Sequence, residues 1–119
     1  MAYVDGFVVP VPKKNVDAYL KMARKAGKVW REHGALEYYE CVADDVKPGK
    51  WTSFPQSVKL KSDETVVFSW IVYKSRKDRD RVNAKVMKDP RIGPSMVQGG
   101  MPFDAKRMIY GGFKVRVDV

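Results

Sequence analysis

The chain has 119 residues, of which 45% are hydrophobic and 31% are charged, a balance that suits one folded domain and excludes a disordered protein. Its 23 Lys and Arg exceed its 14 Asp and Glu, so the net charge is +9 and partners such as nucleic acid have to be considered. No apolar run approaches the ~20 residues that span a bilayer, no basic signal-peptide region opens the chain, and the single Cys41 excludes an internal disulfide. We therefore expect a cytoplasmic protein without membrane contact.

Apolar, strand-like runs predict four strands, at residues 3–9, 36–42, 66–75 and 107–117. An apolar stripe at helical spacing predicts a helix over residues 13–33 that ends before Gly34, and the weak capping box Ser75-x-x-Asp78 begins a second helix over residues 76–88. This order of strands and helices is the ferredoxin-like βαββαβ plan. We expect one α+β domain over the whole chain, 1–119, with a four-stranded antiparallel sheet and both helices on one face.

The predicted third strand is apolar on both of its faces. Val66, Phe68 and Trp70 point to one face, whereas Val67 and Ile71 point to the other. Such a strand needs cover on both sides, and two helices cover only one. Because an exposed apolar patch on the order of several hundred Å² is unusual for a monomer, we expect a homodimer formed through the open sheet face.

RNA-recognition motifs share this βαββαβ order, with a basic-glycine-aromatic signature on the third strand. Here the third strand reads VVFSWIVY over residues 66–73, and the similar RMIYGGF of residues 107–113 falls on the fourth. The basic residues are also interleaved with acids, as on a solvated surface. We do not expect specific nucleic-acid recognition, and weak, charge-driven RNA binding remains an alternative.

Three long segments resemble the YbaA family of small bacterial proteins: YVDGFVVPVP at 3–12, FSWIVYKSR at 68–76 and MPFDAKRMIYGGF at 101–113. The resemblance runs along almost the whole chain and diverges at residues 91–100. It implies a ferredoxin-like protomer of the dimeric α/β-barrel superfamily and carries over no catalytic residues. Members of that superfamily use the cavity between sheet and helices either to bind small molecules or as cofactor-free monooxygenases. The resemblance therefore implies a small-molecule site without a cofactor, with a monooxygenase-like enzyme as the alternative.

The residues alone offer two acid–base candidates, His33 and Asp5. His33, near the end of the first helix, either interacts with the helix dipole or acts as a base at a cavity mouth, oriented by Asp5 or Glu37. Asp5 lies within an apolar strand, where a carboxylate needs a partner. Arg107, at the start of the neighbouring last strand, is the partner we expect, and a site carboxylate is the alternative.

Further predicted ligand-binding residues are Tyr3, Trp30, Trp70 and Tyr110 as aromatic walls, with Arg107 holding an anionic group. The glycine-rich residues 91–105 are a possible lid. One His, one Cys and scattered acids give no recognisable ligand spacing, so we expect no metal. We expect Cys41 to be a small buried residue of the second strand.

Overall fold

The computed structural model describes residues 1–92 and 101–119. Its strands are β1 (Tyr3–Pro12), β2 (Glu37–Val42), β3 (Glu64–Tyr73) and β4 (Ile109–Lys114). Its helices are the short 3-10 helix η1 (Lys13–Asn15) and the α-helices α1 (Val16–His33), α2 (Phe54–Ser57) and α3 (Arg76–Lys88). The strands form one antiparallel sheet in the order β2-β3-β1-β4, which confirms the ferredoxin-like plan.

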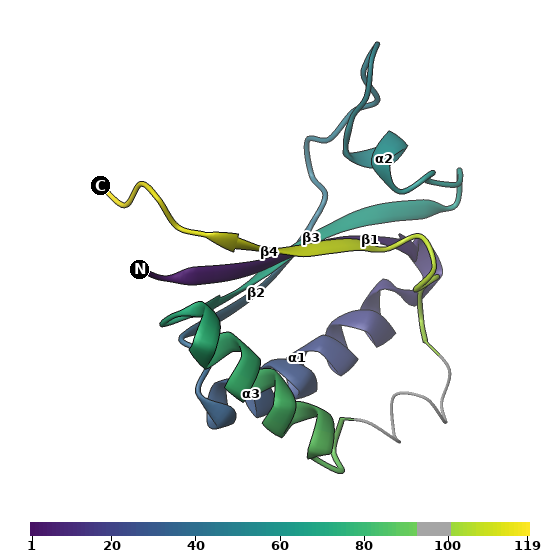
Figure 1. Ribbon diagram of the computed structural model, residues 1–119. Coiled ribbons are helices and arrows are strands. Elements are labelled where there is room, and N and C mark those ends of the chain that lie inside the picture. The colour runs from purple at the N-terminus through teal and green to yellow at the C-terminus, as the bar shows by residue number, and fades with distance from the viewer. Residues whose placement is uncertain (93–100) are drawn as a thin grey trace.

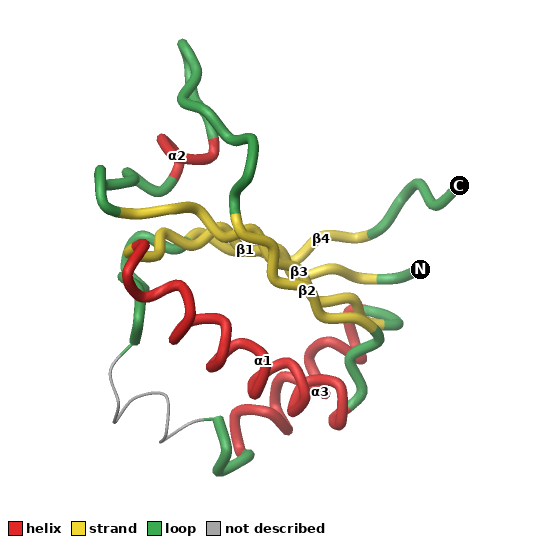
Figure 2. The backbone as a smooth tube through the Cα atoms, turned by 180° about the vertical axis from the view of Figure 1, so that it is seen from behind, coloured by secondary structure: helices red, strands yellow, loops and turns green. Residues whose placement is uncertain are grey.

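Helices α1 and α3 lie together on one face of the sheet, and the short α2 lies on the opposite side (Figure 1). The view from behind shows the same separation (Figure 2). The main core lies between the two long helices and the sheet, where Val29 and Val82 pack with Ile71 and Tyr73. Their burial removes apolar surface from water, the dominant favourable contribution to folding.

Strand β1 continues through Pro10 to Pro12, beyond the predicted end of the 3–9 range. The backbone N–H of Lys13 donates to the carbonyl of Asp63, next to the start of β3. Pro12 and Pro10 lie one and three residues before Lys13, so their nitrogens point to the other side of β1. On that side β4 pairs only with the first half of β1. No ladder hydrogen bond is lost there, which explains why a strand tolerates both prolines.

The ends of the two long helices are stabilised as the sequence predicts. Gly34 follows α1 with a φ of 123°, a left-handed conformation that favours glycine. The Ser75 side chain accepts a hydrogen bond from the backbone N–H of Asp78 and so caps α3. These caps fix where α1 ends and where α3 begins. The last strand is shorter than the predicted 107–117, because only Ile109–Lys114 pair with β1.

The face of the sheet away from α1 and α3 carries exposed aromatic side chains. The exposed fractions are 41% for Phe68, 45% for Tyr39 and 64% for Phe113. Helix α2 covers one end of this face, where Phe54 packs edge-on against Phe68. The prediction that Cys41 is buried is wrong: β2 is an edge strand, and Cys41 lies exposed opposite Phe68. Within the described residues, no helix has the length and apolar character needed to cross a membrane.

Candidate functional site

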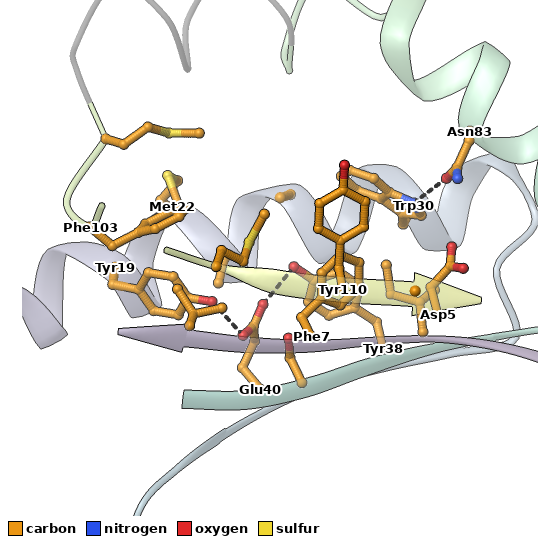
Figure 3. A pocket seen from close by; sticks show the side chains of 18 of the residues that line it. Asp5, Phe7, Tyr19, Met22, Trp30, Tyr38, Glu40, Asn83, Phe103 and Tyr110 are labelled. Atoms are coloured by element: carbon orange, nitrogen blue, oxygen red, sulfur yellow. Dashed lines mark hydrogen bonds between the residues drawn. The ribbon is translucent and has the colours of Figure 1, made fainter. Parts of the chain in front are cut away.

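A cavity of about 590 Å³ lies between the sheet and helices α1 and α3 (Figure 3). Its wall is mainly apolar, with the contributing side chains Phe7, Val9, Met22, Ala26, Ile71 and Met108. Trp30 from α1 and Tyr110 from β4 add aromatic surface, and the Tyr110 ring stacks on Phe7 at a centroid distance of 6.1 Å. The chain thus forms a partly open cavity with apolar walls and a few polar groups, as small-molecule sites do.

One polar group of the cavity is the Asp5 carboxylate on β1. Asp5 is only 6% exposed, and its Oδ1 accepts a hydrogen bond of 2.7 Å from Nη1 of Arg79 on α3. Burial raises the pKa of Asp5, and the Arg79 charge opposes that rise. Beside this pair, Asn83 accepts hydrogen bonds from the Trp30 indole at 3.0 Å and the Tyr73 hydroxyl at 3.2 Å. These contacts hold α1, α3 and the sheet together at this part of the wall.

A second carboxylate, Glu40 on β2, faces the same cavity. Its Oε1 accepts a hydrogen bond of 2.8 Å from the Tyr19 hydroxyl of α1, and its Oε2 accepts one of 2.8 Å from the Tyr38 hydroxyl (Figure 3). Burial raises the pKa of Glu40, against the hydrogen bonds from Tyr19, Tyr38 and Ser69. Burial and the neighbouring Glu40 charge also raise the pKa of both tyrosines, so they remain neutral donors.

The structure places three of the predicted site residues on this wall: Asp5, Trp30 and Tyr110. Tyr3 lies behind the wall in the main core, where Arg79 sits over its ring at 4.9 Å. Gly112 contributes to the wall directly in front of Tyr3, and a Cβ there would collide with the Tyr3 hydroxyl. A glycine at this position is therefore required by the close approach of strand β4 to that ring.

Trp70 does not line the cavity, contrary to the prediction. Its ring packs against Tyr39 and Phe68 on the open face, at centroid distances of 5.0 and 5.5 Å. Side chains alternate along β3, so its neighbours Ser69 and Ile71 point to the cavity instead. Strand periodicity thus places Trp70 on the open face, where it is half-buried beside the exposed rings of Tyr39 and Phe68.

The predicted pair of Asp5 with Arg107 is wrong, because Asp5 pairs with Arg79. In the register of β1 and β4, Asp5 lies opposite Gly112, five positions along the chain from Arg107. Arg107 instead donates to Glu64 Oε1 at 2.8 Å and also bonds Asp104. It lies outside the cavity wall, so an anionic group held there by Arg107 has no geometric support.

His33 also lies outside the cavity wall. Its Nε2 is 2.9 Å from Oδ2 of Asp89, which follows α3, so neither Asp5 nor Glu37 orients the ring. The prediction of those two partners is wrong because the end of α1 packs beside the end of α3. The His33–Asp89 contact ties the two helix ends together.

Three polar residues of the cavity wall were not predicted from the sequence: Glu40, Tyr19 and Arg79. Glu40 and Tyr38 are two positions apart on β2 and share a face, while Tyr19 belongs to the apolar stripe of α1. Glu40 could have been found from strand alternation. It lies on the same face of β2 as Tyr38, and that face is turned toward the apolar stripe of α1.

The predicted lid of residues 91–105 is described only in part. Met101 and Phe103 contribute to the cavity wall, and the Phe103 ring packs edge-on against Tyr19 at 5.5 Å. Residues 93–100 lie outside the described residues. Closure over the cavity therefore stays a prediction.

The sheet order, the two helices on one face and the cavity beneath them define a ferredoxin-like α+β protein. Solved structures agree: the chain aligns with a NIPSNAP family protein of unknown function from Agrobacterium tumefaciens strain C58 at a TM-score of 0.62 and 14% identity, over 96% of this chain and 87% of that one. It also aligns with a dimeric ferredoxin-like protein from an uncultured marine organism at a TM-score of 0.58 and 14% identity, over the full length of both chains. At such identities the likeness shows the fold alone.

The chain belongs to the family described as "Protein of unknown function (DUF1428)", which it matches over residues 2–105. It is 52% identical over 118 residues to "Uncharacterized protein YbaA" of Escherichia coli strain K12, with 99% of each chain covered. The same identity is found with the protein of that name in Shigella flexneri. The resemblance to the YbaA family is thereby confirmed.

Proposed function

We propose that the protein binds a small, largely apolar molecule in the cavity between the sheet and helices α1 and α3. The observation that carries this proposal is the cavity itself: its volume of about 590 Å³ lies within the range of small-molecule sites, and apolar walls meet only a few polar groups. Rings and methionine side chains provide the bulk of the contact surface. Asp5 and Glu40 provide the groups that orient the ligand.

A substitution that fills the cavity with a larger side chain tests whether a ligand binds there. Ala23 on α1 is 3% exposed and lines the cavity, so Ala23→Phe places a ring in the space that a ligand would occupy. Ala18 lies on the same helix and is exposed, so Ala18→Phe is the matched control. We expect calorimetric titration with a soluble aromatic probe, 2-phenylethanol, to show at least about tenfold weaker binding to the first variant and unchanged binding to the second. Equal binding to wild type and to a folded Ala23→Phe protein would contradict the proposal.

The protein also acts as a homodimer in this proposal, with the open sheet faces of two copies in contact. The exposed rings of Tyr39, Phe68 and Phe113 support it, because a second copy would remove them from water. The likeness to a solved protein described as dimeric and ferredoxin-like supports a dimer. A monooxygenase-like reaction and weak RNA binding stay predictions.

A further inference from the structure

The two carboxylates of the cavity differ in their charge partners. Asp5 is neutralised by Arg79, an ion pair with an N–O distance of 2.7 Å. Glu40 contacts the hydroxyl groups of Tyr19 and Tyr38 and, across the described residues, forms no ion pair with Lys, Arg or His. An ionised Glu40 therefore leaves the cavity with an uncompensated negative charge, although the whole chain carries +9.

Glu40 retains the capacity to bind a further donor. Each of its oxygens accepts one tyrosine hydrogen bond and Ser69 provides a third, whereas the two oxygens of a carboxylate together accept about four. The two tyrosines hold the carboxylate in place from α1 and from its own strand, and Figure 3 shows their hydroxyl groups directed at it. The Glu40 carboxylate is thus oriented in advance without being neutralised.

The wall around Glu40 also suits a positive charge. Phe7, Trp30, Tyr38 and Tyr110 all line the cavity. The faces of aromatic rings attract cations, and the attraction grows when the site excludes water. The cation that lines the cavity, Arg79, is paired with the carboxylates of Asp5 and Asp80, so its charge is already balanced and does not favour an anionic ligand.

We propose that the ligand carries a protonated nitrogen on an apolar body, with the nitrogen donating to Glu40 and the body lying along Phe7 and Trp30. This inference rests on the proposed function and names the class of molecule that the cavity selects. If Glu40 serves only to tie β2 to α1 through the tyrosines, the charge of a ligand makes no difference to binding.

Three probes with the same phenyl body distinguish these cases: 2-phenylethylamine, 2-phenylethanol and 3-phenylpropanoate, each titrated calorimetrically into the full chain at neutral pH. A charge-assisted hydrogen bond predicts that wild type binds the amine about tenfold more tightly than the alcohol, and the acid least of all. Glu40→Gln should reduce the preference for the amine to about unity. Glu37→Gln is the matched control: Glu37 is an exposed residue of β2 that shares the open face with Val72, and this variant should keep the preference.

Equal binding of the three probes to wild type would overturn this inference and leave the proposed function intact. The same conclusion follows if a folded Glu40→Gln protein keeps the full preference for the amine. Failure of all three probes to bind would contradict the proposed function and this inference with it. The comparison among probes on wild type needs no variant, so it remains decisive even if Glu40→Gln does not fold.

Discussion

The Arg79 guanidinium on α3 lies 2.7 Å from the Asp5 carboxylate in the middle of the sheet, and both side chains line the cavity. The side chains of Arg79 and Asp5 are only 19% and 8% exposed, so the pair is largely shielded from water. The ion pair joins α3 to β1 at the part of the cavity wall that these two elements form together. The position of α3 over the sheet therefore depends on one ion pair as well as on apolar packing.

Replacing Arg79 with methionine should destabilise the protein by about 2 kcal/mol or more, because it leaves the Asp5 carboxylate buried without its cation. Asp5→Asn combined with Arg79→Met should recover part of that loss. Urea unfolding followed by circular dichroism measures both. Arg76 is the control, since it lies on the same helix with its side chain 66% exposed, and Arg76→Met should cost under about 0.5 kcal/mol. Equal losses of unfolding free energy in Arg79→Met and Arg76→Met would show that the buried Asp5–Arg79 pair stabilises the fold no more than an exposed arginine does.

The contribution of Glu40 to folding stability should fall as pH rises. Burial raises its pKa above the ordinary 4.5, against hydrogen bonds from Tyr19 of α1, Tyr38 of β2 and Ser69 of β3. A carboxyl group with a raised pKa in the folded state contributes stability below the unfolded value, and that contribution is lost as pH rises through the folded value. Glu40→Gln cannot ionise, so its stability relative to wild type should increase between about pH 4 and pH 8.

The difference in unfolding free energy between Glu40→Gln and wild type, measured by urea titration across that range, is the quantity to follow. Carboxyl groups elsewhere whose pKa is lowered, such as Glu64 beside Arg107, affect both proteins alike and cancel in the difference. A difference that stays constant with pH would show that Glu40 does not titrate abnormally.

Gly27 of α1 should not tolerate a side chain, even though alanine is the better helix former. A Cβ at this position would lie 2.7 Å from Cδ1 of the Tyr38 ring. Alanine gains about 1 kcal/mol in helix propensity, whereas overpacking costs about 1–3 kcal/mol. We expect Gly27→Ala to lose about 1 kcal/mol in urea unfolding, and Lys28→Ala on the exposed side to change little. A more stable Gly27→Ala protein would mean that Tyr38 moves freely.

The proposed homodimer should depend on Phe68. Light scattering at micromolar concentration should give twice the chain mass of 13.6 kDa for wild type and a value near the single chain for Phe68→Lys. Ala84→Lys, on an exposed position of α3, should remain dimeric. A dimer that survives the first substitution and dissociates with the second would place the interface on the helices.

Strand order and helix positions could be predicted because they depend on patterns within short segments. The apolar stripe of α1 and the cap at Ser75 fix each element locally, and the ferredoxin-like plan follows from their order. The extension of β1 through its prolines could not be predicted, because it depends on β4 ending opposite Val8 and so leaving Pro10 and Pro12 without a neighbour on that side.

The partners within the site were harder to predict, because they depend on which helix and strand faces meet. Four basic residues fall within residues 76–81, and only the burial of Val82 and Val86 shows that Arg79 shares their face. The sequence therefore favours Arg107, which shortly precedes β4, as the partner of Asp5 over a residue of α3. Strand parity alone would have excluded Trp70 from the cavity, since it alternates with Ser69 and Ile71.

The three tryptophans give the most direct test of the cavity as a binding site. Trp30 lines the cavity, Trp70 lies on the open face, and Trp51 is 85% exposed in the loop before α2. Titration of ¹⁵N-labelled protein with 2-phenylethylamine, followed through the indole N–H resonances, should shift Trp30 progressively and leave Trp51 and Trp70 unchanged. Shifts of Trp70 or Trp51 with Trp30 unmoved would contradict binding between the sheet and the helices.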